Sequence, residues 1–225
     1  MPRPAAITFD VYGTLAQWDE TAADALREVL TRHGRGDADL ELASSVFEAQ
    51  SRLLQAQGAF RSYRRILRDS LRPALAVAGL EPTPEDAETV LGRLARMPPF
   101  PDAPPTLAAL AREHRLAPIS NTDDEFLAGT LEGLGRVFDT TITAEQARAY
   151  KPNPGLFRFA LRKLGVEPTT LLHVAQGTFS DLAVCAALGI RAVWVNRKGA
   201  SLQDGLDPFA VIEDLSALPD LVSSL

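Results

Sequence analysis

The sequence has few residues that could form covalent or metal cross-links. It contains a single cysteine, Cys185, so it forms no internal disulfide, and its three histidines, His33, His114 and His173, are scattered along the chain. Cys185 lies in an apolar helical pattern, and we interpret it as an inert core thiol. His173 lies within an apolar strand pattern, and we interpret it as a core histidine with satisfied hydrogen bonds. The sequence therefore predicts neither a disulfide framework nor a metal cluster.

Long apolar runs and an excess of positive charge are missing too. No apolar run reaches the roughly 18–20 residues of a membrane-spanning helix. The chain moves at once into a strand-like run, so we expect no signal peptide. The net charge of −6 argues against nucleic acid or anionic lipid as the main partner. We expect a cytoplasmic protein that binds neither membranes nor nucleic acids.

Short apolar runs alternate with helical patterns over most of the 225 residues. Near-continuous apolar character is typical of strands that are buried on both faces of a parallel sheet. The strand-like runs are 5–10, 116–121, 140–144, 171–176, 192–196 and 210–214, and the helical patterns are 104–114, 123–134, 154–164 and 181–188. This alternation predicts an α/β fold with a parallel sheet and helices on both faces.

Residues 19–97 interrupt the alternation. They read as four helices, over 19–33, 39–57, 61–79 and 84–96, and the proline-rich segment 97–105 reads as a return linker. We therefore predict a core formed by residues 1–15 and 98–225, with a small all-α cap, residues 16–97, inserted after the first strand.

Polar residues follow four of the predicted strands or the loops beyond them. They are Asp10, Ser120 with Asn121, Lys151 and Asp181. Each alone has a structural explanation, such as capping a turn or a helix. In open parallel sheets, however, sites lie at the carboxyl ends of the strands. The occurrence of all four groups in this order favours a single functional site.

Four motifs carry a family resemblance. "FDVYGTL" (9–15), "SN" (120–121), "YKPNP" (150–154) and "HVAQGTFSD" (173–181) resemble the four signature motifs of the haloacid dehalogenase-like hydrolases. The resemblance implies a Rossmann-like core, a helical cap over the site, and an aspartate nucleophile, which is Asp10 here.

Tyr12 separates two chemistries within that family. Most members are Mg²⁺-dependent phosphatases, whose first motif has a second aspartate at this position as the general acid for an alkoxide leaving group. A phenol, with an ordinary pKa of about 10, is a poor replacement. A halide leaves as a stable anion and needs no proton. The family's 2-haloacid dehalogenases carry Asp-x-Tyr and use no metal. The resemblance thus implies a cofactor-free hydrolase that cleaves the carbon–halogen bond of short 2-haloalkanoates, through an aspartyl ester.

The resemblance also implies roles for the site residues. We expect Thr14 to orient Asp10, Lys151 to keep it ionised, and Asp181 to orient either Lys151 or the hydrolytic water. The expected substrate-binding residues are Ser120 and the N–H groups of Val11 and Tyr12 for the substrate carboxylate, Asn121 and Phe179 for the halide, and Gln176, Trp18 and Arg52 around the pocket.

Two features depart from the dehalogenase pattern. The fourth motif is one residue longer between valine and aspartate than in the best-matching dehalogenases, and Gln176 stands where phosphatases carry an acid. The dehalogenases also place a cap arginine against the halide. The segment 50–65 holds Arg52, Arg61, Arg64 and Arg65, and none matches in both spacing and context.

Two alternatives therefore stay open. One is a Mg²⁺-dependent phosphatase of the same fold that tolerates Tyr12. The other is a non-catalytic relative that binds a small anion or a partner protein. By analogy with relatives, we also expect a homodimer.

Overall fold

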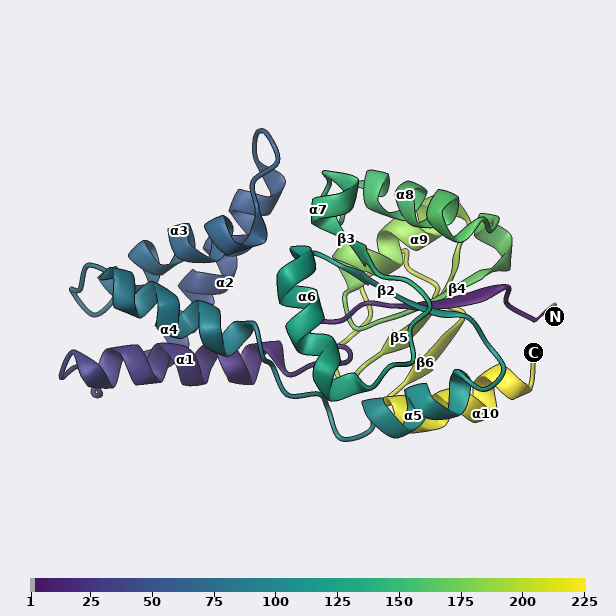
Figure 1. The fold of residues 1–225 in the computed structure, drawn as a ribbon, viewed down its shortest axis with the longest axis horizontal. Coiled ribbons are helices and arrows are strands. Elements are labelled where there is room, and N and C mark those ends of the chain that lie inside the picture. The colour runs from purple at the N-terminus through teal and green to yellow at the C-terminus, as the bar shows by residue number, and fades with distance from the viewer. Residues whose placement is uncertain (1–2) are drawn as a thin grey trace.

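The computed structural model describes residues 3–225, and its centre is a six-stranded parallel sheet (Figure 1). The strands are β1 (Ala6–Phe9), β2 (Leu116–Ser120), β3 (Ile142–Thr143), β4 (Leu171–Ala175), β5 (Arg191–Val195) and β6 (Ala210–Ile212), in the order β3-β2-β1-β4-β5-β6. All six predicted strands are present. β1 lies between β2 and β4, and Phe9 pairs with both Pro118 and Val174. The groups that follow these three strands therefore meet at one edge.

Helices cover both faces of the sheet, which confirms the predicted Rossmann-like α/β fold. Figure 1 shows α8 and α9 on one side of the sheet and α5 and α10 on the other. The core helices are α5 (Ala103–Leu110), α6 (Asp124–Leu131), α7 (Ala144–Ala147), α8 (Pro154–Leu164), α9 (Ala183–Leu188) and α10 (Leu218–Ser223). The predicted linker 97–105 is wrong at its end, because α5 already begins at Ala103. Proline is tolerated in the first turn of a helix, where its missing N–H has no helical partner.

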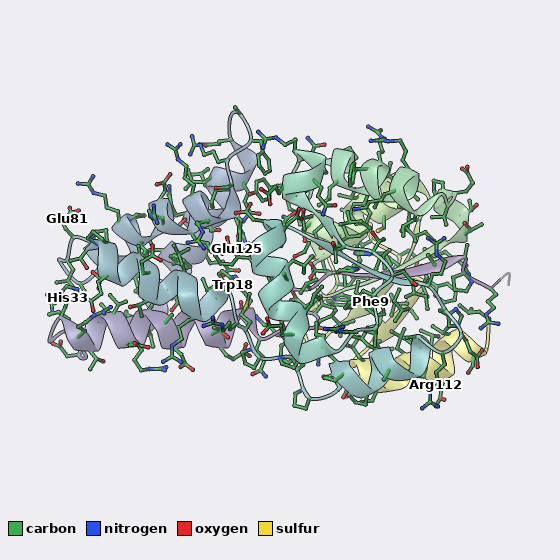
Figure 2. The ribbon with its side chains drawn as sticks, viewed as in Figure 1. Phe9, Trp18, His33, Glu81, Arg112 and Glu125 are labelled. Carbon is green, nitrogen blue, oxygen red and sulfur yellow. The ribbon has the colours of Figure 1, made fainter. Side chains whose placement is uncertain are left out.

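Four further helices gather at one end of the molecule (Figure 1). They are α1 (Trp18–Arg32), α2 (Leu40–Ala56), α3 (Tyr63–Ala76) and α4 (Pro84–Leu94), and each begins within two residues of its predicted start. The starts have local causes. The Asp39 side chain accepts the N–H of Leu42, and Thr83 and Asp86 form a capping box around Pro84. α1 packs on α4 and α2 on α3. Figure 2 shows Trp18 at the end of α1 that faces the sheet and His33 at the far end.

The chain crosses between the sheet and these helices twice, and the two crossings lie side by side. The Gln17 N–H donates to the Pro98 carbonyl at 3.0 Å, and the Phe100 N–H donates to the Leu15 carbonyl at 2.9 Å. The division of the chain into a core and a cap at residues 15 and 98 stays a prediction. Over residues 3–225, no helix is both long and apolar enough to cross a membrane.

Candidate active site

Three buried charged side chains meet beyond the carboxyl ends of β1 and β4. Asp10 follows β1, Asp181 follows β4, and Lys151 lies in the loop before α8. The Lys151 Nζ atom donates to Asp10 Oδ1 at 2.7 Å and to Asp181 Oδ1 at 2.6 Å. The side chains of Lys151 and Asp181 are 2% and 1% exposed. One buried ammonium thus bridges a fully buried carboxylate, Asp181, and a carboxylate that is 11% exposed, Asp10.

The orientation of the Lys151 ammonium is fully determined. Its third N–H donates to the Ile119 carbonyl at 3.1 Å, so all three of its donors have acceptors. Burial alone lowers the pKa of a lysine, but the charges of Asp10 and Asp181 outweigh it and raise the pKa of Lys151 above its usual value. The side chain therefore carries a positive charge across the ordinary pH range.

The two carboxylates differ in their environment. Burial raises the pKa of Asp181, but the charge of Lys151 and the hydrogen bond from His173 outweigh it and lower that pKa to about 2. For Asp10, burial is the largest effect and raises its pKa above the usual value, while Lys151 opposes this and Asp181 adds to it. A pair of acids whose pKa values are pushed apart is typical of sites where the two have different roles.

Thr14 holds the second oxygen of Asp10. Its hydroxyl donates to Asp10 Oδ2 at 2.8 Å and accepts the backbone N–H of Gln176 at 2.9 Å. The turn between them needs Gly13, whose φ is +83°. A side chain at residue 13 would also stand 3.4 Å from Oε1 of Gln176. Gln176 therefore lies against the loop that carries Asp10.

Three hydrogen-bond donors near Asp10 have no acceptor. The Ser120 hydroxyl is buried and has no hydrogen-bond partner among residues 3–225. In the same part of the chain, the backbone N–H groups of Val11 and Tyr12 donate no hydrogen bond. Buried donors are seldom left unpaired in native proteins, so these three groups suit an anionic ligand.

The hydroxyl of Tyr12 is bonded to another side chain, and its ring packs on α3. The hydroxyl forms a 3.0 Å hydrogen bond with Thr122 Oγ1, and the ring stacks on Tyr63 of α3 at 6.0 Å between centroids. Burial raises the pKa of Tyr12 to about 12, so its hydroxyl stays protonated at neutral pH. Trp18 reaches this region only through Tyr63, to whose hydroxyl its Nε1 donates at 2.9 Å.

Asn121 holds the main chain of Lys151 rather than pointing freely into the site. Its Oδ1 accepts the Lys151 N–H at 2.7 Å, and its Nδ2 donates to the Lys151 carbonyl at 3.0 Å. The remaining Nδ2 hydrogen donates to Oε1 of Gln55 on α2, also at 3.0 Å. A role of Asn121 as a halide donor would therefore require the bond to Gln55 to open.

The side chains of Arg52 and Phe179 are both exposed to solvent. Arg52 is 75% exposed and pairs with Glu48, one helical turn before it on α2. Phe47 and Ser51 form the buried side of α2, and Arg52 follows Ser51 onto another face. Phe179 is 65% exposed. The assignment of Arg52 to the pocket is corrected, because its side chain is a surface charge paired with Glu48; the role of Phe179 at the halide stays a prediction.

Two of the other three cap arginines are paired with acids, whereas the Arg61 side chain forms no ion pair within residues 3–225. Arg64 pairs with Glu125, and Arg65 with Asp69. Arg61 contributes its carbonyl oxygen, which accepts the hydroxyl of Tyr150 at 2.9 Å.

Comparison with known proteins agrees with this arrangement. The model of the haloacid dehalogenase-like hydrolase family matches residues 4–189. The chain belongs to this family.

Individual relatives point in the same direction. The chain is 28% identical over 203 residues to (S)-2-haloacid dehalogenase 4A of Burkholderia cepacia, covering 86% of this chain and 84% of that protein. It is 33% identical over 167 residues to a phosphoserine phosphatase of Thermus thermophilus, covering 73% and 61%. The structure of L-2-haloacid dehalogenase from Xanthobacter autotrophicus matches with a TM-score of 0.86 and 25% identity over 99% of both chains.

The fourth family motif winds as a π-helical turn, Thr178–Leu182. This turn carries Asp181, whose Oδ1 accepts the Lys151 ammonium at 2.6 Å. Gly177 is required here for close approach. A Cβ at this position would lie 2.6 Å from Asp181 Oδ2 and 2.3 Å from Ser180 Oγ.

The donor set around Asp10 fits a magnesium ion poorly. Mg²⁺ prefers hard oxygen ligands in octahedral geometry. Asp10 and Asp181 both bind the Lys151 ammonium, and Gln176 supplies only a neutral amide. Residues 3–225 contain no group of three or more histidine, cysteine, aspartate or glutamate side chains that could hold a metal ion.

Sequence reasoning missed three residues that touch the site's framework. His173 contacts Asp181, Gln55 contacts Asn121, and the Asp123 carboxylate accepts the N–H groups of Tyr63 and Arg64 at 2.7 and 2.9 Å. Gln55 and Asp123 join segments far apart in the chain, so no local pattern marks them. Only the polar character of His173 within an apolar strand was a signal.

Proposed function

We propose that this protein is a metal-independent 2-haloacid dehalogenase that acts on short 2-haloalkanoates. The observation that carries the proposal is the state of Tyr12. A hydroxyl that is bonded to Thr122, with a pKa of about 12, gives the leaving group no effective acid. The substrate must therefore release a group that is stable as a free anion, and a halide meets that requirement.

In the first step, a carboxylate oxygen of Asp10 attacks the α-carbon of the substrate. A C–O bond forms as the carbon–halogen bond breaks, the halide leaves with the bonding electrons, and the configuration at the carbon inverts. The result is an ester between Asp10 and the substrate. Lys151 and Thr14 hold the two Asp10 oxygens at 2.7 and 2.8 Å, which fixes the direction of attack.

Water then attacks the carbonyl carbon of the Asp10 ester. This releases a 2-hydroxy acid, places the oxygen atom of the water in the Asp10 carboxylate, and yields one proton. With a pKa of about 2, Asp181 is a weak base, so it orients Lys151 rather than deprotonating the water. The substrate carboxylate binds Ser120 and the N–H groups of Val11 and Tyr12.

Halide release is the test. EDTA-treated enzyme is incubated with chloroacetate, fluoroacetate and both enantiomers of 2-chloropropionate, and Asp10→Asn is the matched control. We expect release by the wild type and none by the variant. If no haloacid yields halide, the proposal fails.

A second candidate is a phosphatase of the same family, favoured by the relative from Thermus thermophilus. In that case 4-nitrophenyl phosphate is hydrolysed with Mg²⁺, and EDTA abolishes the reaction. A relative that only binds an anion would show neither activity. A homodimer stays a prediction, which sedimentation of the purified protein would test.

A further inference from the structure

A chain of hydrogen bonds runs from the sheet to Asp10. Thr8 Oγ1 of β1 lies 2.9 Å from Nδ1 of His173 on β4, and Nε2 of His173 lies 2.9 Å from Asp181 Oδ1. The same Asp181 oxygen accepts Lys151, and Lys151 donates to Asp10. The His173 side chain is fully buried. Its ring stands edge-on to Phe157 at 4.9 Å between centroids.

The direction of the bond to Asp181 follows from its partners. An ionised carboxylate only accepts hydrogen bonds, so Nε2 of His173 is the donor. The other Asp181 oxygen accepts the Ser180 hydroxyl at 2.5 Å. Asp181 is carried by the π-turn, whereas His173 is carried by an inner strand. The imidazole therefore ties the carboxylate to the rigid part of the fold.

We propose that His173 is a positioning residue, which holds Asp181 so that Lys151 is placed against Asp10. The inference rests on the proposed function, in which Lys151 keeps the nucleophile ionised and aligned. No contact of His173 with the substrate is involved. Its effect passes through Asp181 and Lys151 only.

The titratable groups that face Asp181 determine how loss of the His173 hydrogen bond changes the pH dependence of activity. They are Lys151 from the loop before α8, His173 from β4, Asp10 from the loop after β1, and Cys185 from α9, whose thiol pKa is raised by burial. Removing the His173 donor disfavours the ionised form of Asp181. Asp181 then holds Lys151 less firmly against Asp10, so Lys151 favours the ionised form of Asp10 less, the pKa of Asp10 rises, and activity is lost at a higher pH.

The test compares two residues of similar shape, only one of which donates a hydrogen bond: His173→Met and His173→Gln. For His173→Met we expect kcat to fall about tenfold to a hundredfold, as for other residues that orient a catalytic group. KM stays nearly unchanged, and the acid limb of the pH–rate profile moves up by about one unit. His173→Gln restores most of kcat and returns the acid limb of the pH–rate profile to its wild-type position. Thr8→Val removes the hydrogen bond to Nδ1 of His173 but keeps the imidazole. It should shift the acid limb in the same direction as His173→Met, by a smaller amount.

The control is the only other histidine–aspartate pair among residues 3–225. His33 lies 3.0 Å from the buried Asp86, at the end of α1 that points away from the sheet (Figure 2). His33→Phe lowers stability and leaves the pH profile unchanged. The proposal is overturned if His173→Met and His173→Gln behave alike, or if kcat falls equally at every pH. If His173→Met does not fold, the proposal is overturned when Thr8→Val leaves the acid limb of the pH–rate profile unchanged.

A second readout needs no turnover. In protein with ¹³C-labelled aspartate carboxyls, we expect the pKa of Asp181 to rise in His173→Met and to return in His173→Gln. Wild-type enzyme that releases no halide disproves the proposed function, and this titration still decides the role of His173. An unchanged Asp181 titration overturns the inference.

Discussion

The two sides of the candidate active site are built from different groups. On the sheet side, Asp10, Lys151, Asp181 and Thr14 are joined by hydrogen bonds of 2.6 to 2.8 Å. On the helical side, the groups that reach the site are aromatic rings, one amide and backbone N–H groups. Three of the four cap arginines that the sequence suggested, Arg52, Arg64 and Arg65, pair with nearby acids.

This difference separates two tasks. The sheet side contains the nucleophile Asp10 and the charged groups that orient it, Lys151 and Asp181, in largely buried contacts. The helical side closes the site and shapes it, through Tyr63 against Tyr12 and through Gln55 against Asn121. Changes on the sheet side should therefore affect the chemistry, and changes on the helical side should affect binding.

The largest effect is expected for Lys151→Met. It leaves two buried carboxylates without their cation, and breaking such a pair typically costs about 3–5 kcal/mol of unfolding free energy. Activity should fall by at least about a hundredfold, because loss of the cation disfavours ionised Asp10. Urea unfolding and halide release measure the two effects. The control is Lys163→Met on α8, whose exposed ammonium donates to Thr141 and Gln146, lies over the Phe159 ring, and pairs with no acid within residues 3–225. Equal losses in both variants would contradict the account.

Thr14→Val should move the pH dependence of activity. Asp10 must be ionised to attack, and burial raises its pKa, so activity falls as the pH drops through that raised value. The Thr14 hydroxyl favours the ionised form, and a hydrogen bond to a charged group is worth about 1.5–3 kcal/mol. Its loss raises the pKa of Asp10 by about one to two units. The acid limb of kcat/KM then shifts upward, and an unshifted limb would show that Thr14 only supports the turn.

Asp123→Ala should weaken the contact between the sheet side and the helical side of the site. Its carboxylate accepts two N–H groups at the start of α3, and loss of such a cap costs about 0.5–2 kcal/mol. Because α3 carries Tyr63, KM should rise while kcat changes less. Asp39→Ala is the matched control, since Asp39 caps α2 from within the helical side. It should cost similar stability with KM unchanged. A KM that rises equally in Asp123→Ala and Asp39→Ala would contradict a specific role of Asp123 in joining the two sides of the site.

Tyr12→Phe separates the two chemistries with a small expected effect. Loss of one neutral hydrogen bond costs about 0.5–1.5 kcal/mol of stability. Loss of a general acid would instead reduce kcat by about 10²–10⁴-fold. We expect kcat for halide release to stay within a few-fold of the wild type. A loss in the larger range would show that the phenol acts in catalysis.

Arg52→Ala should have the smallest effect. An exposed ion pair contributes about 0–1 kcal/mol, so stability and halide release should both stay close to those of the wild type. A clear rise in KM for the haloacid would show that Arg52 turns into the site when substrate binds. The helical side would then supply charge after all.

Local pattern predicted much of the fold. Apolar runs located the six strands, and helical periodicity with caps such as Asp39 and Thr83 located the helices of the inserted segment. The short helix α7, with four residues, and the terminal helix α10, with six, were missed because elements of this length carry little periodicity.

The site was predictable where motifs follow strands, and not where contacts are long-range. The meeting of Asp10, Lys151 and Asp181 follows from strand order, because parallel strands bring their carboxyl ends to one edge, whereas the role of Thr14 was implied by the family resemblance. Arg52 could not be placed, since one residue along a helix changes the face that a side chain occupies. The π-turn at Thr178–Leu182, which carries Asp181, was not predicted, because no local sequence signal marked it.

The central claim is that Asp10 displaces a leaving group that needs neither an acid nor a metal ion. The most direct measurement is a single turnover of 2-chloropropionate by EDTA-treated enzyme in water enriched in oxygen-18, followed by mass spectrometry of the peptide that contains Asp10. The account predicts that the label enters the Asp10 carboxylate and that the first 2-hydroxypropionate released is unlabelled. Label in the product alone, or a reaction that stops until Mg²⁺ is returned, would contradict it.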